Sequence, residues 1–95
     1  MVLLYQYADD LDNSQIGFSV PKRNFKKAVD RNRIKRQLRE IYRLNKQNIA
    51  EITDRKMAMF LIFNSNKMPD YKELEKNFML LLERLKNDIS NEDLQ

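Results

Sequence analysis

The chain has 95 residues, enough for one small domain, and it contains neither cysteine nor histidine. Without cysteine there is no disulfide, no thiolate metal site and no thiol nucleophile. Without histidine the usual general base and the commonest zinc ligand are missing as well. These absences exclude Ser-His-Asp, Cys-His and most metallohydrolase chemistry.

The net charge of +4 is distributed unevenly along the chain. From Lys22 to Lys46 there are eleven basic and two acidic residues, a local net charge of +9. The rest of the chain holds seven basic and twelve acidic residues, a net charge of −5. One basic block in an otherwise acidic chain predicts a docking surface for a polyanion.

Apolar runs are too short to cross a membrane, since none reaches about 18 residues. The first residues, Met1 to Tyr7, lack the basic and long apolar regions of a signal peptide. We therefore expect a soluble cytoplasmic protein with no membrane association.

Two strands are predicted near the N-terminus. Residues 2–7 are apolar and aromatic in a run too short for a helix, and residues 15–20 alternate, with Ile16, Phe18 and Val20 on one face. Pro21 ends the second strand, and we expect the two strands to pair as an antiparallel hairpin. The acidic residues between them, at 9, 10 and 12, are expected to form a turn rather than a metal site.

A helix and a third strand follow. Residues 28–44 have helical periodicity, with Ile34, Leu38 and Ile41 on one face and Tyr42 at its border. Residues 57–63 are seven consecutive apolar residues, which predicts a strand covered on both faces.

The last helix is predicted to begin after Asp70, which stands three residues before Glu73 at capping-box spacing. Its apolar stripe runs from Tyr71 to Leu85, and a frayed polar tail is expected over residues 89–95. Residues 1–95 thus form a single α+β domain of order ββαβα, with helices packed on a small sheet.

Polar and basic side chains gather on one stripe of the first helix. They fall within a sector of about 100°, opposite the apolar face, and extend along about 16 Å. Only Glu40 is available to balance them within the stripe, so repulsion among the cations favours a polyanionic ligand over a solvated surface. Two further arginines, Arg31 and Arg33, lie nearer the flanks, where either the ligand or the fold could engage them. The stripe consists of Asn32, Lys35, Arg36, Arg39 and Arg43.

The run from Arg31 to Arg39, followed by Glu40, resembles the Arg-Asn-Arg signature helix of the bacterial ribonuclease P protein subunit. Residues 17–20 with Lys22 and Arg23 resemble the strand before that helix, and residues 57–63 with the last helix resemble the end of the family's domain. The resemblance covers nearly the whole chain.

The resemblance implies a ribonuclease P protein-like fold with a left-handed βαβ crossover, against the usual preference for right-handed connections. It also implies the protein subunit of an endonuclease whose RNA subunit binds the catalytic Mg²⁺ and removes the 5′ leader from precursor tRNA. The expected partners are ribonuclease P RNA and precursor tRNA, with no protein partner, no catalytic side chain and no metal ligand in this chain. The RNA-binding positions carried over are Arg31, Asn32, Arg33, Lys35, Arg36 and Arg39; to these the basic patch adds Arg43, Lys22, Arg23, Lys26 and Lys27.

The resemblance further implies that single-stranded leader RNA lies across the sheet beside the signature helix. Aromatic stacking and cations are the usual means of binding single strands. By the resemblance Tyr5 is a leader-contacting candidate, with Phe18 and Tyr7 weaker, and a role in the core is the alternative for each.

The chain departs from the family in two places. The family's first helix, which normally precedes the first strand, is missing, so the start is either placed too late or naturally short, and we expect an exposed apolar face. In the lysine-rich turn, Pro21 and Phe25 also replace the serine and glycine that are common in the family.

Two other functions remain open from the sequence. The same stripe suits a non-enzymatic nucleic-acid-binding protein, ribosomal or DNA-architectural, and it also suits docking to an acidic protein.

Overall fold

The computed structural model describes residues 1–93. It contains β1 (Val2–Tyr7), β2 (Gln15–Ser19), α1 (Ala28–Leu44), α2 (Lys46–Ala50), β3 (Met57–Ile62) and α3 (Tyr71–Asp93). The predicted α+β class and the order ββαβα are confirmed, and the predicted bounds of α1 match the structure. The short helix α2 is an addition that the sequence pattern did not predict.

The three strands form one sheet in the order β1-β3-β2. The central strand β3 pairs antiparallel with β1 and parallel with β2. The predicted hairpin of β1 and β2 is therefore wrong, because β3 lies between the two strands. The parallel pairing of β2 and β3 makes β2-α1-β3 a βαβ crossover, as the resemblance implies. That this crossover is left-handed stays a prediction.

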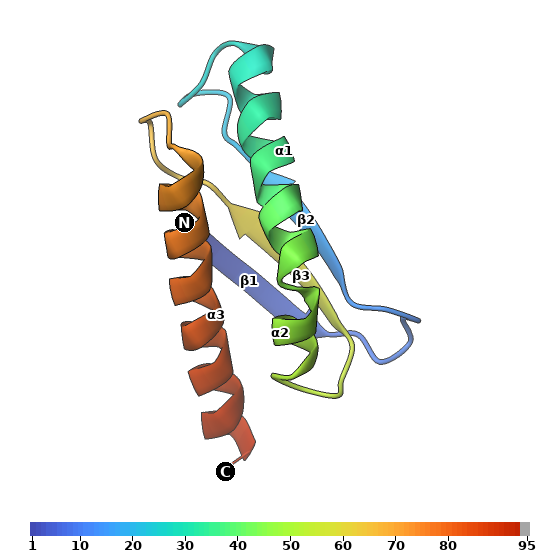
Figure 1. The fold of residues 1–95 in the computed structure, drawn as a ribbon. Helices are drawn as coiled ribbons and strands as arrows, with labels where there is room; N and C mark the ends of the chain where they lie inside the picture. The colour runs from blue at the N-terminus through green and yellow to red at the C-terminus, as the bar shows by residue number, and fades with distance from the viewer. Residues whose placement is uncertain (94–95) are drawn as a thin grey trace.

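All three helices lie on one face of the sheet (Figure 1), with α1 beside β2 and α3 in contact with α1. The core forms between the helices and this face. The sheet contributes Met57, Met59 and Leu61, and α1 contributes the predicted face of Ile34, Leu38 and Ile41, all three with no exposed surface.

The opposite face of the sheet is open within the described residues. Phe60 is 44% exposed and Leu4 is 54% exposed, and Val2 lies on the same face. The expected exposed apolar face is thus present, whereas the predicted coverage of the third strand on both faces is wrong. The alternating burial of β3 follows from helices packing on one side alone.

Helix α3 begins where the sequence predicts, because the Glu73 amide donates to Asp70 Oδ1 at 2.8 Å. At its other end α3 continues through Asp93 and Ile89 is buried, so the helix replaces the frayed segment expected from residue 89. Residues 94 and 95 of that segment lie outside the described residues. No helix in the described part of the chain is both long and apolar enough to span a membrane.

Candidate nucleic-acid interface

Helix α1 holds the basic stripe on the side away from the core. Its buried residues fix the rotation of the helix, so residues three and four positions apart on the opposite side face outward together. Asn32, Arg36 and Arg39 are exposed and Lys35 is half-buried, as the predicted stripe requires. Arg33 is exposed too, on the flank of the stripe.

Arg43 differs from the rest of the stripe because it is paired. Its Nε and Nη2 donate to the two carboxylate oxygens of Glu40 at 3.0 and 2.6 Å. These hydrogen bonds lower the pKa of Glu40 and raise that of Arg43. Within the described part of the chain, Lys35, Arg36 and Arg39 form no ion pair, so the unbalanced charge is concentrated on these three residues.

Arg31, the first residue of the signature, points toward the fold. Its Nη1 donates to the carbonyl oxygens of Phe25 and Lys26, at 2.7 and 2.9 Å. Phe25 is buried and packs against Phe63, with 6.0 Å between ring centroids. Arg31 therefore fixes the loop before α1, and its guanidinium is engaged by that loop.

The loop held in this way presents four cations. Pro21 O accepts hydrogen bonds from the amides of Asn24 and Phe25, which closes a turn. The departures from the family at positions 21 and 25 thus lie in the turn itself, one as an acceptor and one as a buried anchor. The exposed cations around them are Lys22, Arg23, Lys26 and Lys27, which extend the positive surface beyond the N-terminus of α1.

A groove of about 500 Å³ runs between α1 and strand β2. Arg39, Tyr42 and Lys46 form one wall, and residues 14–18 form the other. Lys46 Nζ lies 5.8 Å from the centre of the Tyr42 ring, a cation–π contact. Burial raises the pKa of Tyr42 above its usual value. Since β2 is an edge strand, the groove opens along the side of the sheet.

Asn45 shapes the corner of this groove at the junction of α1 and α2. It is buried, and its side-chain amide donates to Ile41 O at 2.8 Å, while its own Oδ1 accepts from Asn48. These bonds satisfy the polar groups where one helix ends and the next begins. Because the junction is fixed, Lys46 starts α2 beside Tyr42.

The two leader-contacting candidates lie at opposite edges of the sheet. Phe18 lines the groove and meets Tyr42 edge-to-face, with 6.4 Å between centroids. Tyr5 lies on β1, two strands away, and its hydroxyl donates to Glu92 Oε1 at 3.1 Å. The neighbouring Tyr7 hydroxyl donates to Glu92 Oε2 at 3.0 Å. The structure brings Phe18 to the α1 stripe and leaves Tyr5 and Tyr7 beside α3.

One carboxylate of the loop after β1, that of Asp9, is paired with an arginine. Arg55 donates to both oxygens of Asp9, at 3.2 and 2.8 Å, and lies 3.6 Å from the centre of the Tyr7 ring. The hydrogen bond from Arg55 lowers the pKa of Asp9. Within the described residues, no three Asp, Glu, His or Cys side chains converge where they could hold a metal ion.

Sequence reasoning missed Tyr42 and Lys46 as members of the interface. A signal was present, because residues 39, 42 and 46 continue the helical stripe at spacings of three and four. Tyr42 was assigned to the border of the apolar face, and the extra helix α2 that carries Lys46 was not predicted.

A search of family models matches residues 1–86 to the family described as Ribonuclease P. Among curated proteins, the ribonuclease P protein component of Ectopseudomonas mendocina is 48% identical over 52% of this chain and 37% of its own length. That of Porphyromonas gingivalis is 34% identical over 81% of this chain and 58% of its own length. The ribonuclease P protein component of Clostridium novyi is 37% identical over 88% of this chain and 73% of its own length.

The chain therefore spans less than two thirds of the length of the first two of these relatives. No solved structure gives a significant match.

Proposed function

The chain belongs to the ribonuclease P protein family, and from this premise we propose that it is the RNA-binding subunit of a ribonuclease P ribonucleoprotein. Its partners are ribonuclease P RNA and precursor tRNA, and the reaction is endonucleolytic hydrolysis that removes the 5′ leader. The catalytic Mg²⁺ would be held by the RNA subunit, where it would activate water and stabilise the leaving oxygen. The proposal places the protein in the cytoplasm with its substrate.

The unpaired charge on α1 is the observation that carries this proposal. Arg36 and Arg39 are exposed and Lys35 is half-buried, on one side of a helix whose other side is fully buried. Cations held a few ångströms apart repel each other, and phosphates that bind between them relieve this repulsion. A rigid helix therefore offers RNA a fixed row of charges.

The positive surface contributes to cleavage without chemical steps of its own. Two RNA molecules repel each other through their phosphates, and cations between them lower the cost of bringing them together. The side chains on α1 and in the loop before it would do this where precursor tRNA meets the RNA subunit. The protein should therefore lower the Mg²⁺ concentration that cleavage requires.

The groove beside α1 suits a single strand such as the 5′ leader. Arg39 and Lys46 supply charge in one wall, where Tyr42 adds aromatic surface, and Phe18 supplies aromatic surface in the opposite wall. Cations that follow the backbone and aromatic rings that contact bases are the usual elements of single-strand recognition. Phe18 is thus the leader-contacting candidate favoured by its position, ahead of Tyr5.

A precursor-tRNA cleavage assay at low Mg²⁺ tests the proposal. A bacterial ribonuclease P RNA is assayed alone, with the wild-type chain, and with the Arg36→Ala/Arg39→Ala double variant. The matched control is Lys72→Ala/Lys76→Ala, which removes two exposed cations from α3 instead. We expect stimulation by the wild type and the control and little by the α1 variant.

Two results contradict the proposal. Tight RNA binding without any stimulation by the wild type would indicate a nucleic-acid-binding protein outside ribonuclease P. Equal stimulation by all three proteins would show that the α1 stripe is not the RNA-binding surface.

A further inference from the structure

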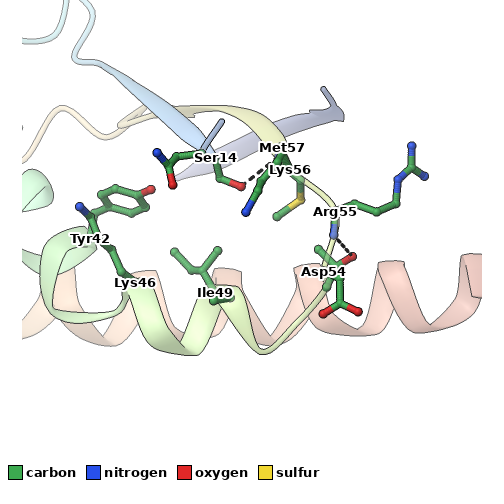
Figure 2. Close-up of a pocket in the computed structure, with 11 residues that line it drawn as sticks. Ser14, Tyr42, Lys46, Ile49, Asp54, Arg55, Lys56 and Met57 are labelled. Carbon is green, nitrogen blue, oxygen red and sulfur yellow. Dashed lines mark hydrogen bonds between the residues drawn. The ribbon is translucent and has the colours of Figure 1, made fainter. Parts of the chain in front are cut away.

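A second pocket, of about 540 Å³, adjoins the groove beside α1. It lies between α2, the loop before β2 and the start of β3 (Figure 2). The two hollows share Ser14, Tyr42 and Lys46, so they form one continuous depression around the Tyr42 side chain. A strand bound along β2 would therefore lie next to the second pocket.

The second pocket combines an apolar floor with two lysines, and the Asp54 carboxylate also belongs to its lining. Ile49 and Met57, both buried in the core, form the apolar floor of the pocket. Figure 2 shows Lys56 pointing into the pocket and Lys46 rising beside Tyr42, whereas Arg55 points away. Neither lysine forms an ion pair within the described part of the chain, so both ammonium groups can bind an anion.

Local hydrogen bonds keep the pocket in this shape. Ser14 Oγ accepts from the Met57 amide at 3.0 Å, which ties the loop before β2 to the start of β3. The Ala8 amide donates to Lys56 O at 2.9 Å, so the backbone of Lys56 is fixed while its side chain stays available. A preformed pocket loses less entropy when it binds a ligand.

We propose that this pocket binds further nucleotides of the single-stranded RNA held in the groove beside α1. This inference rests on the proposed function, since it extends the same bound strand. Lys46 and Lys56 contact its phosphates, and a base lies over the apolar floor against Tyr42. A nucleotide joins an anionic phosphate to a flat aromatic base, and the pocket offers lysines to the first and the Tyr42 ring to the face of the second.

Length-dependent binding tests this assignment. Fluorescent oligouridylates of about four and about twelve nucleotides are titrated with the full chain, because the short one fits the groove alone and the long one reaches the second pocket. The variants are Lys56→Gln, which lies only in the second pocket, and Arg39→Gln, which lies only in the groove. Lys72→Gln on α3 controls for net charge.

We expect Lys56→Gln to weaken binding of the long oligouridylate about three- to fivefold and to reduce its log–log salt slope by about 0.7, with no effect on the short one. Arg39→Gln should weaken both, and Lys72→Gln neither. Unchanged urea midpoints confirm that the variants fold.

The outcomes separate the two proposals. Equal effects of Lys56→Gln on short and long RNA, or effects no larger than those of Lys72→Gln, overturn the pocket assignment and leave the groove intact. An Arg39→Gln variant that binds both oligouridylates like wild type instead overturns the groove. Displacement of the long oligouridylate by oligoglutamate at equal charge concentration would assign the pocket to an acidic peptide.

Discussion

Arg31 donates a 2.7 Å hydrogen bond to the carbonyl oxygen of Phe25, so a signature residue that sequence similarity assigns to RNA is committed to the fold. The same guanidinium nitrogen also contacts Lys26 O. The loop that carries the four cations before α1 is thereby joined to the first turn of the helix. Arg31 therefore supports the loop that carries these four cations, whereas Arg33 is exposed on the flank of the stripe.

This difference predicts unequal stability effects for two arginines of the same helix turn. Arg31→Ala removes two charged hydrogen bonds to carbonyls at the edge of the core, which should lower the free energy of unfolding by about 1–2 kcal/mol. Arg33→Ala should change it by less than about 0.5 kcal/mol. Urea unfolding measures both; equal midpoints for the two variants would refute a structural role for Arg31.

The stripe on α1 predicts unequal contributions to RNA binding. Arg39→Gln removes an unpaired cation and should reduce the log–log salt slope by about 0.7–0.9. Arg43→Gln should have a smaller effect, because Glu40 already neutralises much of the Arg43 charge. Filter binding of ribonuclease P RNA at several salt concentrations measures these slopes.

Removing the Glu40 carboxylate should change RNA affinity in the opposite direction. Glu40→Gln releases Arg43 and deletes the carboxylate that repels phosphate, so affinity should rise about two- to fivefold. If Glu40→Gln leaves affinity unchanged while Arg43→Gln costs as much as Arg39→Gln, the ion pair does not persist when RNA binds.

Local patterns in the sequence predicted α1 well and strand pairing poorly. The spacing of Ile34, Leu38 and Ile41 determines which side of a helix is buried, and that information lies within a few residues. Pairing of β1 with β3 joins segments some fifty residues apart, as Tyr5 and Met59 show. No periodicity within β1 or β2 indicates that β3 will lie between them.

The candidate interface was also predicted in part: its helical stripe was predicted, and its loop contacts and groove were not. The basic stripe follows from helical geometry, so its exposure was correctly predicted. The Arg31 contacts depend on a loop conformation, and the groove depends on which strand lies beside α1. The separation of Tyr5 from Phe18 follows from the strand order, which the hairpin hypothesis had wrong.

Gly17 allows close packing on the open face of the sheet. A Cβ atom at this position would lie 2.9 Å from Phe60 Cδ2 on the neighbouring strand. Gly17→Ala should therefore lower the free energy of unfolding by about 1 kcal/mol, because the ring must move. In a Phe60→Ala background the same change should be neutral or stabilising, by up to about 1 kcal/mol, since alanine restricts the unfolded chain.

A double-mutant cycle measured by urea unfolding gives the coupling between these positions. Independent, additive effects of Gly17→Ala and Phe60→Ala would show that the ring contact does not limit the residue at position 17.

The contact between Tyr5 and α3 predicts a loss of stability at alkaline pH. Burial first, and then the Glu92 carboxylate, raise the pKa of Tyr5 from 10.0 to about 12. Both the folded and unfolded chains keep this phenol protonated below pH 10. Between pH 10 and about 12 only the unfolded state releases the proton, so the free energy of unfolding falls as pH rises through this window.

Comparison of the wild type with Tyr5→Phe isolates this contribution, because other titrating groups change stability equally in both proteins. We expect Tyr5→Phe to flatten the dependence of the urea midpoint on pH above 10. Glu92→Gln should retain part of the slope, since burial is the largest cause of the shift and remains. Identical slopes in the wild type and Tyr5→Phe would mean that the Tyr5 hydroxyl is solvated, and Tyr5 would again be available to stack on a base.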